Sequence, residues 1–213
     1  MFTVQCGTPP STASTAPVIY GFAGVNQTAN AGTVTAIRAS ISWTVPPKMV
    51  DGHPVSTWIA FANASAGTGV SYRIAQVGWI QTQSEQPRVF WEWGSSKADS
   101  HKQYGAQLVL GRALEVEVDL TGATYSFYAN GVALGSGLTS WSPTAVGAFA
   151  ETQDPSEYLP GSSGQPEVIS AIAEKINGKW MPYSGEVLTT RPVYHVTAFD
   201  DGSVHIWDGR QSE

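Results

Sequence analysis

Two polar side chains interrupt apolar segments that are otherwise typical of β-strands. Gln76 lies within the run 72–80, and Glu92 lies within the run 88–93. A polar group on the packed face of a strand costs roughly 1 to 3 kcal/mol if it is left without a hydrogen bond. Each of these side chains therefore either pairs with other polar groups or takes part in chemistry.

A third polar position, Glu151, ends the expected strand 141–151. Ala145, Gly147 and Phe149 share its face, because side chains along a strand alternate between the two faces of a sheet. Most of these neighbours are small, and this favours open space above the sheet at this point. The alternative is that Glu151 begins the loop that follows and is solvated.

The combination of a carboxylate and an amide in one cleft suits the hydrolysis of a peptide bond. The carboxylate takes a proton from a water molecule as general base, and the amide donates a hydrogen bond to the oxyanion that forms on the attacked carbonyl. The protonated carboxyl then returns the proton to the leaving amine. This chemistry needs neither a nucleophilic serine nor a metal ion.

Other catalytic and cofactor motifs are absent from the sequence. It contains no GxSxG elbow, no HExxH helix, no glycine-rich phosphate loop and no paired-cysteine metal spacing. His195 and His205 fall on neighbouring strands of one expected hairpin, but they lack a third ligand. Glu115, Glu117 and Asp119 alternate along a strand and are expected to form a solvated face. We therefore expect no cofactor and no metal.

The composition favours one globular domain with an aromatic core. The chain has 213 residues, of which 42% are hydrophobic and 13% are charged, and its formal net charge is −6. No basic run occurs, so nucleic acid is not an expected partner. No apolar run approaches the roughly 20 residues of a membrane helix, so a membrane is not expected either. We expect a monomer that is secreted or at the cell surface, although residues 1–16 lack the features of a signal peptide.

Alternating apolar and polar residues predict an all-β fold. Residues 37–45 alternate with the period of two that a half-buried strand requires. Asn130-Gly131 predicts a two-residue turn within the hairpin 124–136. The segment 167–176 is ambiguous between helix and strand, and its β-branched residues favour a strand.

The remaining segments complete a sandwich with a short arm before it. A run rich in Pro, Ser and Thr indicates an extended N-terminal arm over residues 1–17, followed by a single β-sandwich domain over residues 18–213. The polar segment 94–103 is expected to be a loop. Further strands are expected at 55–61, 72–81, 89–93, 106–110, 114–120, 193–199 and 203–207.

Several short motifs occur in one order along the chain. They are Ser42-Trp-Thr-Val-Pro46, Val55-Ser-Thr-Trp-Ile59, Ile74-Ala-Gln-Val-Gly78, Phe90-Trp-Glu-Trp93 and a strand ending at Glu151. In order and spacing this set resembles the glutamic peptidases, also called eqolisins, over about half of the chain. The resemblance implies a concanavalin A-like, jelly-roll type sandwich of two curved antiparallel sheets. It also implies an endopeptidase that acts on polypeptides, at acidic pH.

The resemblance implies catalytic roles for Gln76 and Glu151. Gln76 stands where the family's catalytic glutamine stands, and the segment 145–151 resembles the strand that ends in the catalytic glutamate. Glu92 and Trp43 match residues that line the family's cleft. The candidate substrate-binding residues are Trp43, Trp58, Glu92 and Trp91.

The sequence departs from the family pattern in two places. After Trp58 the family continues with a Gly-Ile-Asp-Gly turn, whereas this chain reads Ile-Ala-Phe-Ala-Asn. Before Glu151 the family shows a Trp-containing segment, and Gly147-Ala-Phe-Ala150 stands in its place. The substrate pockets can therefore differ even if the catalytic pair is retained.

Two other functions stay open at this point. A concanavalin-like module that binds carbohydrate or another ligand without cleaving it would use exposed Trp and Tyr rings to stack on sugars. A structural domain that kept the fold and lost the chemistry would fit the missing acidic turn. In either case backbone groups satisfy Gln76, and Arg73 or Arg88 pairs with Glu92.

Overall fold

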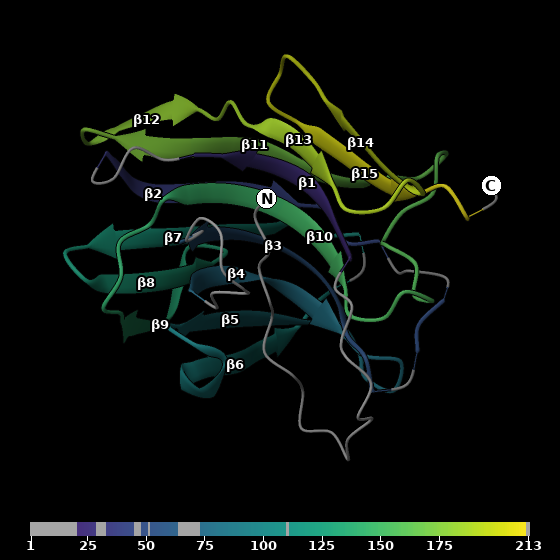
Figure 1. Ribbon diagram of the computed structural model, residues 1–213, viewed down its shortest axis with the longest axis horizontal. Helices are drawn as coiled ribbons and strands as arrows, with labels where there is room; N and C mark the ends of the chain where they lie inside the picture. The colour runs from purple at the N-terminus through teal and green to yellow at the C-terminus, as the bar shows by residue number, and fades with distance from the viewer. Residues whose placement is uncertain are drawn as a thin grey trace.

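The strands of the protein form two antiparallel sheets that pack face to face, as Figure 1 shows. The computed structural model describes residues 21–28, 33–44, 48–50, 52–63, 73–109 and 111–211. The expected arm over residues 1–17 and the start of the expected domain lie outside the described residues. The described part confirms the expected all-β sandwich.

Sheet A has seven strands in the order β13-β1-β10-β3-β4-β5-β6. In Figure 1, β10 lies between β1 and β3. The strands are β1 (Gly21–Gln27), β3 (Val55–Ala62), β4 (Ile74–Gln81), β5 (Arg88–Gly94), β6 (Ser100–Gln107), β10 (Ala145–Thr152) and β13 (Glu186–Thr189).

Sheet B has eight strands in the order β14-β15-β11-β2-β7-β8-β9, with β12 paired to β11. A 3-10 helix, η1 (Lys97–Asp99), precedes β6, and no helix of the described residues is long and apolar enough to cross a membrane. The strands are β2 (Val34–Ile41), β7 (Leu114–Thr121), β8 (Thr124–Ala129), β9 (Val132–Leu138), β11 (Glu167–Ile176), β12 (Lys179–Pro182), β14 (Tyr194–Ala198) and β15 (Val204–Asp208).

The space between the sheets is filled by apolar side chains from both of them. On β2 the buried inward positions are Ile37, Ala39 and Ile41, as the alternation predicted. Phe61 of β3 meets Tyr125 of β8 across this space, with ring centroids 5.6 Å apart. Burial of such surface stabilises the fold by roughly 25 cal/mol per Å².

The face of sheet A that points away from sheet B, here called the outer face, carries a second buried apolar cluster. The rings of Trp58 and Phe149 lie 5.2 Å apart, and Phe22 approaches Trp58 edge-on at 6.3 Å. Strands β3 and β10 are therefore buried on both faces, and most of their residues are correspondingly apolar. The cluster consists of Phe22, Trp58, Ala60, Ala62, Ile74, Ile80, Phe90 and Phe149.

Two sequence expectations are confirmed and one is corrected. Asn130 and Gly131 have positive φ angles of 50° and 74° and connect β8 to β9, as the hairpin turn requires. The segment 167–176 is the strand β11. The expected loop over 94–103 instead contains η1 and the start of β6. Its polar composition is explained by its position, because β6 is an edge strand with mostly exposed side chains.

Candidate functional site

Gln76 and Glu92 lie side by side on the outer face of sheet A. They are directly opposite each other in the antiparallel pairing of β4 with β5. Nε2 of Gln76 donates a hydrogen bond of 2.8 Å to Oε2 of Glu92. Both side chains are fully buried. The register of two neighbouring strands thus holds an amide and a carboxylate together away from solvent.

Glu92 is also held by two residues of the next strand, β6. Oγ of Ser100 donates a 2.5 Å hydrogen bond to Oε1, and Nζ of Lys102 lies 3.3 Å from Oε2. Lys102 is opposite Glu92 in the register of β5 with β6, and its side chain is only 9% exposed. Glu92 therefore pairs with Lys102, which corrects the expectation that Arg73 or Arg88 would be its partner.

Glu151 occupies a second polar position on the same face. It lies in β10 opposite Ser56 of β3 and is fully buried, so it does not begin a solvated loop. Nε1 of Trp58 donates a 2.9 Å hydrogen bond to Oε2 of Glu151. Oγ of Ser56 lies 3.4 Å from the same oxygen. Two donors on β3 thus fix the orientation of this carboxylate.

Gln76 and Glu151 share a face but do not lie opposite each other. Through Ser56, Glu151 is in register with Ile80 of β4, four residues beyond Gln76. Strands rise about 3.3 Å per residue and lie about 4.8 Å apart, so the two Cα positions differ by roughly 13 Å along the sheet and roughly 10 Å across it. By the same register Trp58 lies midway between them. Among the described residues, Gln76 bonds to Glu92 whereas Glu151 bonds to Trp58 and Ser56.

The position of β10 in register with Gln76 is occupied by Gly147. Ala60 of β3 lies between these two residues. A Cβ atom added to Gly147 would lie 2.4 Å from Cε2 of Phe149, so the Phe149 ring covers this position. On this side Gln76 therefore faces a methyl group and an aromatic ring.

The four candidate substrate-binding residues divide between two environments. Trp58 and Glu92 lie on the outer face of sheet A with Gln76. Trp91 precedes Glu92 in β5, so it points to the other face and packs against the core between the sheets. Trp43 follows β2 of sheet B and packs against the same core. Neither tryptophan therefore lies on the outer face with Gln76: alternation along β5 directs Trp91 inward, and Trp43 packs beside the core after the end of β2.

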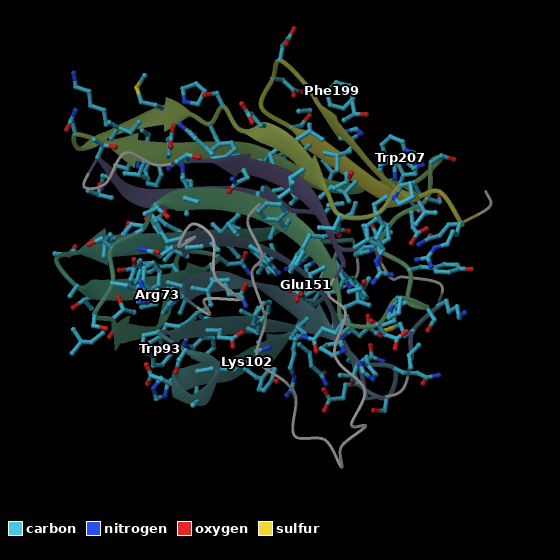
Figure 2. All side chains as sticks on the ribbon, in the orientation of Figure 1. Arg73, Trp93, Lys102, Glu151, Phe199 and Trp207 are labelled. Carbon is cyan, nitrogen blue, oxygen red and sulfur yellow. The ribbon has the colours of Figure 1, made fainter. Side chains whose placement is uncertain are left out.

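The two histidines of the last hairpin, His195 and His205, pack against aromatic rings. His195 stacks on Trp207 with centroids 5.2 Å apart, and His205 lies 4.6 Å from Phe199. Figure 2 labels Trp207 and Phe199 on the hairpin formed by β14 and β15. Within the described residues no group of three or more His, Cys, Asp or Glu is placed to hold a metal ion.

Three polar residues of the outer face were not among the sequence candidates: Ser56, Ser100 and Lys102. The sequence could have placed Ser56 on this face, because it lies two residues before Trp58 and side chains alternate along a strand. Ser100 and Lys102 fall in the polar segment that reads as a loop. Figure 2 shows Lys102 and Glu151 at separate places on sheet A, where Lys102 pairs with Glu92 and Glu151 accepts from Trp58.

A further carboxyl, Glu167, lies inside the sandwich and away from the outer face. It begins β11 and is fully buried, and Nε1 of Trp79 donates a 2.9 Å hydrogen bond to its Oε1. Burial raises the pKa of Glu167 from 4.5 to about 8. Trp79 belongs to β4 but projects to the inner face, opposite to Gln76. This carboxyl therefore affects stability and does not belong to the amide and carboxylate site.

Comparison with solved structures identifies the fold, whereas comparison of the sequence finds no match. No protein-family model and no curated protein sequence matches the chain. SCP-B, a member of the eqolisin family of peptidases solved in a complex with the tripeptide Ala-Ile-His, has a TM-score of 0.62 and 11% identity, over 90% of this chain and 99% of that chain. Scytalido-glutamic peptidase, solved with a peptide-based transition state analogue, has a TM-score of 0.56 and 12% identity over 90% and 99%. The chain therefore has the sandwich fold of these peptidases.

Proposed function

We propose that the protein hydrolyses peptide bonds of polypeptides at the outer face of sheet A, as a glutamic-type endopeptidase that acts at acidic pH. The observation that carries the proposal is the 2.8 Å hydrogen bond between Nε2 of Gln76 and Oε2 of Glu92. It brings together the amide donor and the carboxylate that the chemistry needs. The fold shared with SCP-B supports the same conclusion.

The proposed reaction uses water as the nucleophile. A carboxylate removes a proton from water while the water oxygen bonds to the peptide carbonyl carbon, and the carbonyl electrons move to its oxygen. Nε2 of Gln76 donates to Glu92 in the structure, and in the proposed reaction the same amide donates a hydrogen bond to the oxyanion. The protonated carboxyl then gives its proton to the leaving nitrogen as the C–N bond breaks.

Two carboxylates are candidates for the general base. Glu92 contacts Gln76 directly, whereas Glu151 is the residue that the family resemblance implies. The strand register separates Glu151 from Gln76 by roughly 13 Å along the sheet. We therefore assign the base to Glu92 and treat Glu151 as the second candidate. All three side chains are closed to solvent, so substrate entry requires the outer face to open.

The test is cleavage of an acid-denatured protein by the full chain between pH 2 and pH 7. Gln76→Ala removes the oxyanion donor and is expected to lower kcat by roughly 10² to 10³. Glu92→Gln removes the base while keeping the side-chain shape, and a loss at least as large is expected. Glu151→Gln is expected to lower kcat less than Glu92→Gln does.

The test includes a control variant and has results that would contradict the proposal. Glu186→Gln changes an exposed carboxylate of β13 in the same sheet and is expected to leave cleavage unchanged. Circular dichroism establishes that each variant is folded. A loss in Glu151→Gln with full activity in Glu92→Gln would transfer the base to Glu151. Absence of cleavage by the unmodified chain would contradict the peptidase proposal.

A non-catalytic module that binds a polypeptide or glycan is the second candidate function. The observation in its favour is Gly147, which places no polar side chain in register with Gln76. The carboxylate of Glu151 is held by Trp58 and Ser56 instead. In this case the unmodified chain binds the denatured substrate or a glycan over the same pH range and releases no fragments.

A further inference from the structure

A hollow with a volume of about 310 Å³ lies on sheet B, away from the outer face of sheet A. It is formed by β2, β7 and β8 and by the turn that connects β8 to β9. The residues that line it are Arg38, Glu115, Val116, Glu117, Tyr128 and Gly131.

Arg38 is held in place by an aromatic ring. Its guanidinium carbon lies 4.1 Å from the ring centroid of Trp180, which belongs to β12. Glu117 is opposite Arg38 in the register of β2 with β7, yet no ion pair forms between Arg38 and a carboxylate of the described residues. This cation–π contact places the guanidinium over the Trp180 ring, and its N–H groups can donate to another acceptor.

The acceptors of the hollow come from one strand. Glu115 and Glu117 are two residues apart on β7, so both carboxylates point away from the core. Partial burial raises the pKa of Glu117, and the nearby Asp119 carboxyl raises it further. Tyr128 of β8 is opposite Glu117 and adds a ring and a hydroxyl. Carboxylate, hydroxyl and guanidinium groups thus meet over neighbouring strands.

The turn leaves one end of the hollow open. Gly131 has a φ of 74°, and an added Cβ would meet no atom within 4 Å. The turn therefore supplies a wall without a side chain, and an extended ligand can continue past it.

We infer that this hollow binds a neutral saccharide. The carboxylates of Glu115 and Glu117 line the hollow together with Arg38, and the charges of Asp119 and Lys175 also act on Glu117. Charges of both signs therefore surround the hollow, so neither an anion nor a cation meets groups of a single opposing sign. A sugar hydroxyl both donates and accepts hydrogen bonds, so a saccharide can use the guanidinium and the carboxylates at once. The ring of Tyr128 offers an apolar surface for the C–H face of a pyranose.

The test is titration of the full chain with neutral trisaccharides of glucose, mannose, xylose or galactose, followed by calorimetry. At least one is expected to bind with a millimolar or lower Kd. Arg38→Gln and Tyr128→Ala are each expected to raise that Kd by roughly tenfold, which corresponds to about 1.4 kcal/mol. Tyr128→Phe and Glu117→Gln keep the side-chain shape and test the hydroxyl and the charge separately.

Two control variants separate this site from the other surfaces of the molecule. Trp207→Ala removes an aromatic ring on β15, and Glu186→Gln changes an exposed carboxylate of β13 in sheet A, so neither is expected to alter the Kd. The inference is overturned if no neutral trisaccharide binds or if Arg38→Gln and Tyr128→Ala bind as tightly as the unmodified chain. Tighter binding of a charged trimer, of galacturonic acid or of glucosamine, would also overturn it.

Discussion

Nε1 of Trp58 donates a 2.9 Å hydrogen bond to Oε2 of Glu151, and both side chains are fully buried. The indole therefore holds the Glu151 carboxylate on the side of the face away from Gln76. The same ring packs on Phe22 and Phe149. The aromatic cluster thus separates the two polar positions of the outer face.

Trp58→Phe is expected to destabilise the fold by about 1 to 3 kcal/mol, because it leaves a buried carboxylate without its indole donor. Phe retains most of the ring packing, so the loss of the hydrogen bond dominates. The measurement is chemical denaturation at a fixed pH. In a Glu151→Gln background the same substitution is expected to have a smaller effect, and an equal effect in both backgrounds would contradict the coupling.

Lys102→Met is expected to be more destabilising, by about 3 to 5 kcal/mol, since it leaves the buried charge of Glu92 without its ion-pair partner. Met keeps a similar length of apolar chain. The double variant Glu92→Gln/Lys102→Met removes both charges and is expected to recover most of the stability. Denaturation of the four proteins gives the coupling energy, and a coupling near zero would show that the pair is not an energetic unit.

The sequence correctly indicated the polar residues that interrupt an apolar strand. Gln76 and Glu92 stood out because apolar strands rarely carry such groups, and the structure pairs them with each other. Trp43 and Trp91 could not be placed in this way. Trp91 lies within β5 and Trp43 just after β2, and the direction of each ring depends on which sheet and which face it occupies.

The relation between Gln76 and Glu151 also depends on information that a single sequence lacks. Alternation correctly placed each residue on a defined face of its own strand. The offset of four residues arises from the register of β10 with β3 and of β3 with β4. Register between strands that are distant in sequence is set by the whole packed sheet. The side chains that β6 contributes to the outer face could not be predicted from the sequence either, because an edge strand needs no apolar alternation.

Gly78→Ala is expected to destabilise the protein by more than about 3 kcal/mol, the upper end of the usual range for overpacking. A Cβ there would lie 2.0 Å from the carbonyl oxygen of Thr57 and 2.6 Å from the Cα of Trp58. Both atoms are backbone, so the strand itself must move. Gly105→Ala is the matched control, because its Cβ would meet only side chains, the nearest at 3.3 Å on Val89. Similar denaturation midpoints for the two variants would contradict this prediction.

The stability of the protein is expected to fall as pH rises from about 4.5 to about 8. Burial raises the pKa of Glu167 from 4.5 to about 8, and burial raises the pKa of Glu157 from 4.5 to about 7 although three backbone N–H groups contact it. Between these values the folded protein binds protons that the unfolded chain has released. Stability is therefore fully present below pH 4.5 and is lost as pH rises through the folded pKa values.

Glu167→Gln tests the origin of this pH dependence. The amide cannot ionise and still offers an oxygen to Nε1 of Trp79, so the variant is expected to lose less stability than the unmodified protein between pH 4.5 and pH 8. One group that is protonated only in the folded state changes stability by about 1.4 kcal/mol per pH unit, which sets the size of the difference in slope. Glu115→Gln, at an exposed position of β7, is the control and is expected to keep the original slope. Parallel stability curves for Glu167→Gln and the unmodified protein would rule out Glu167 as the source.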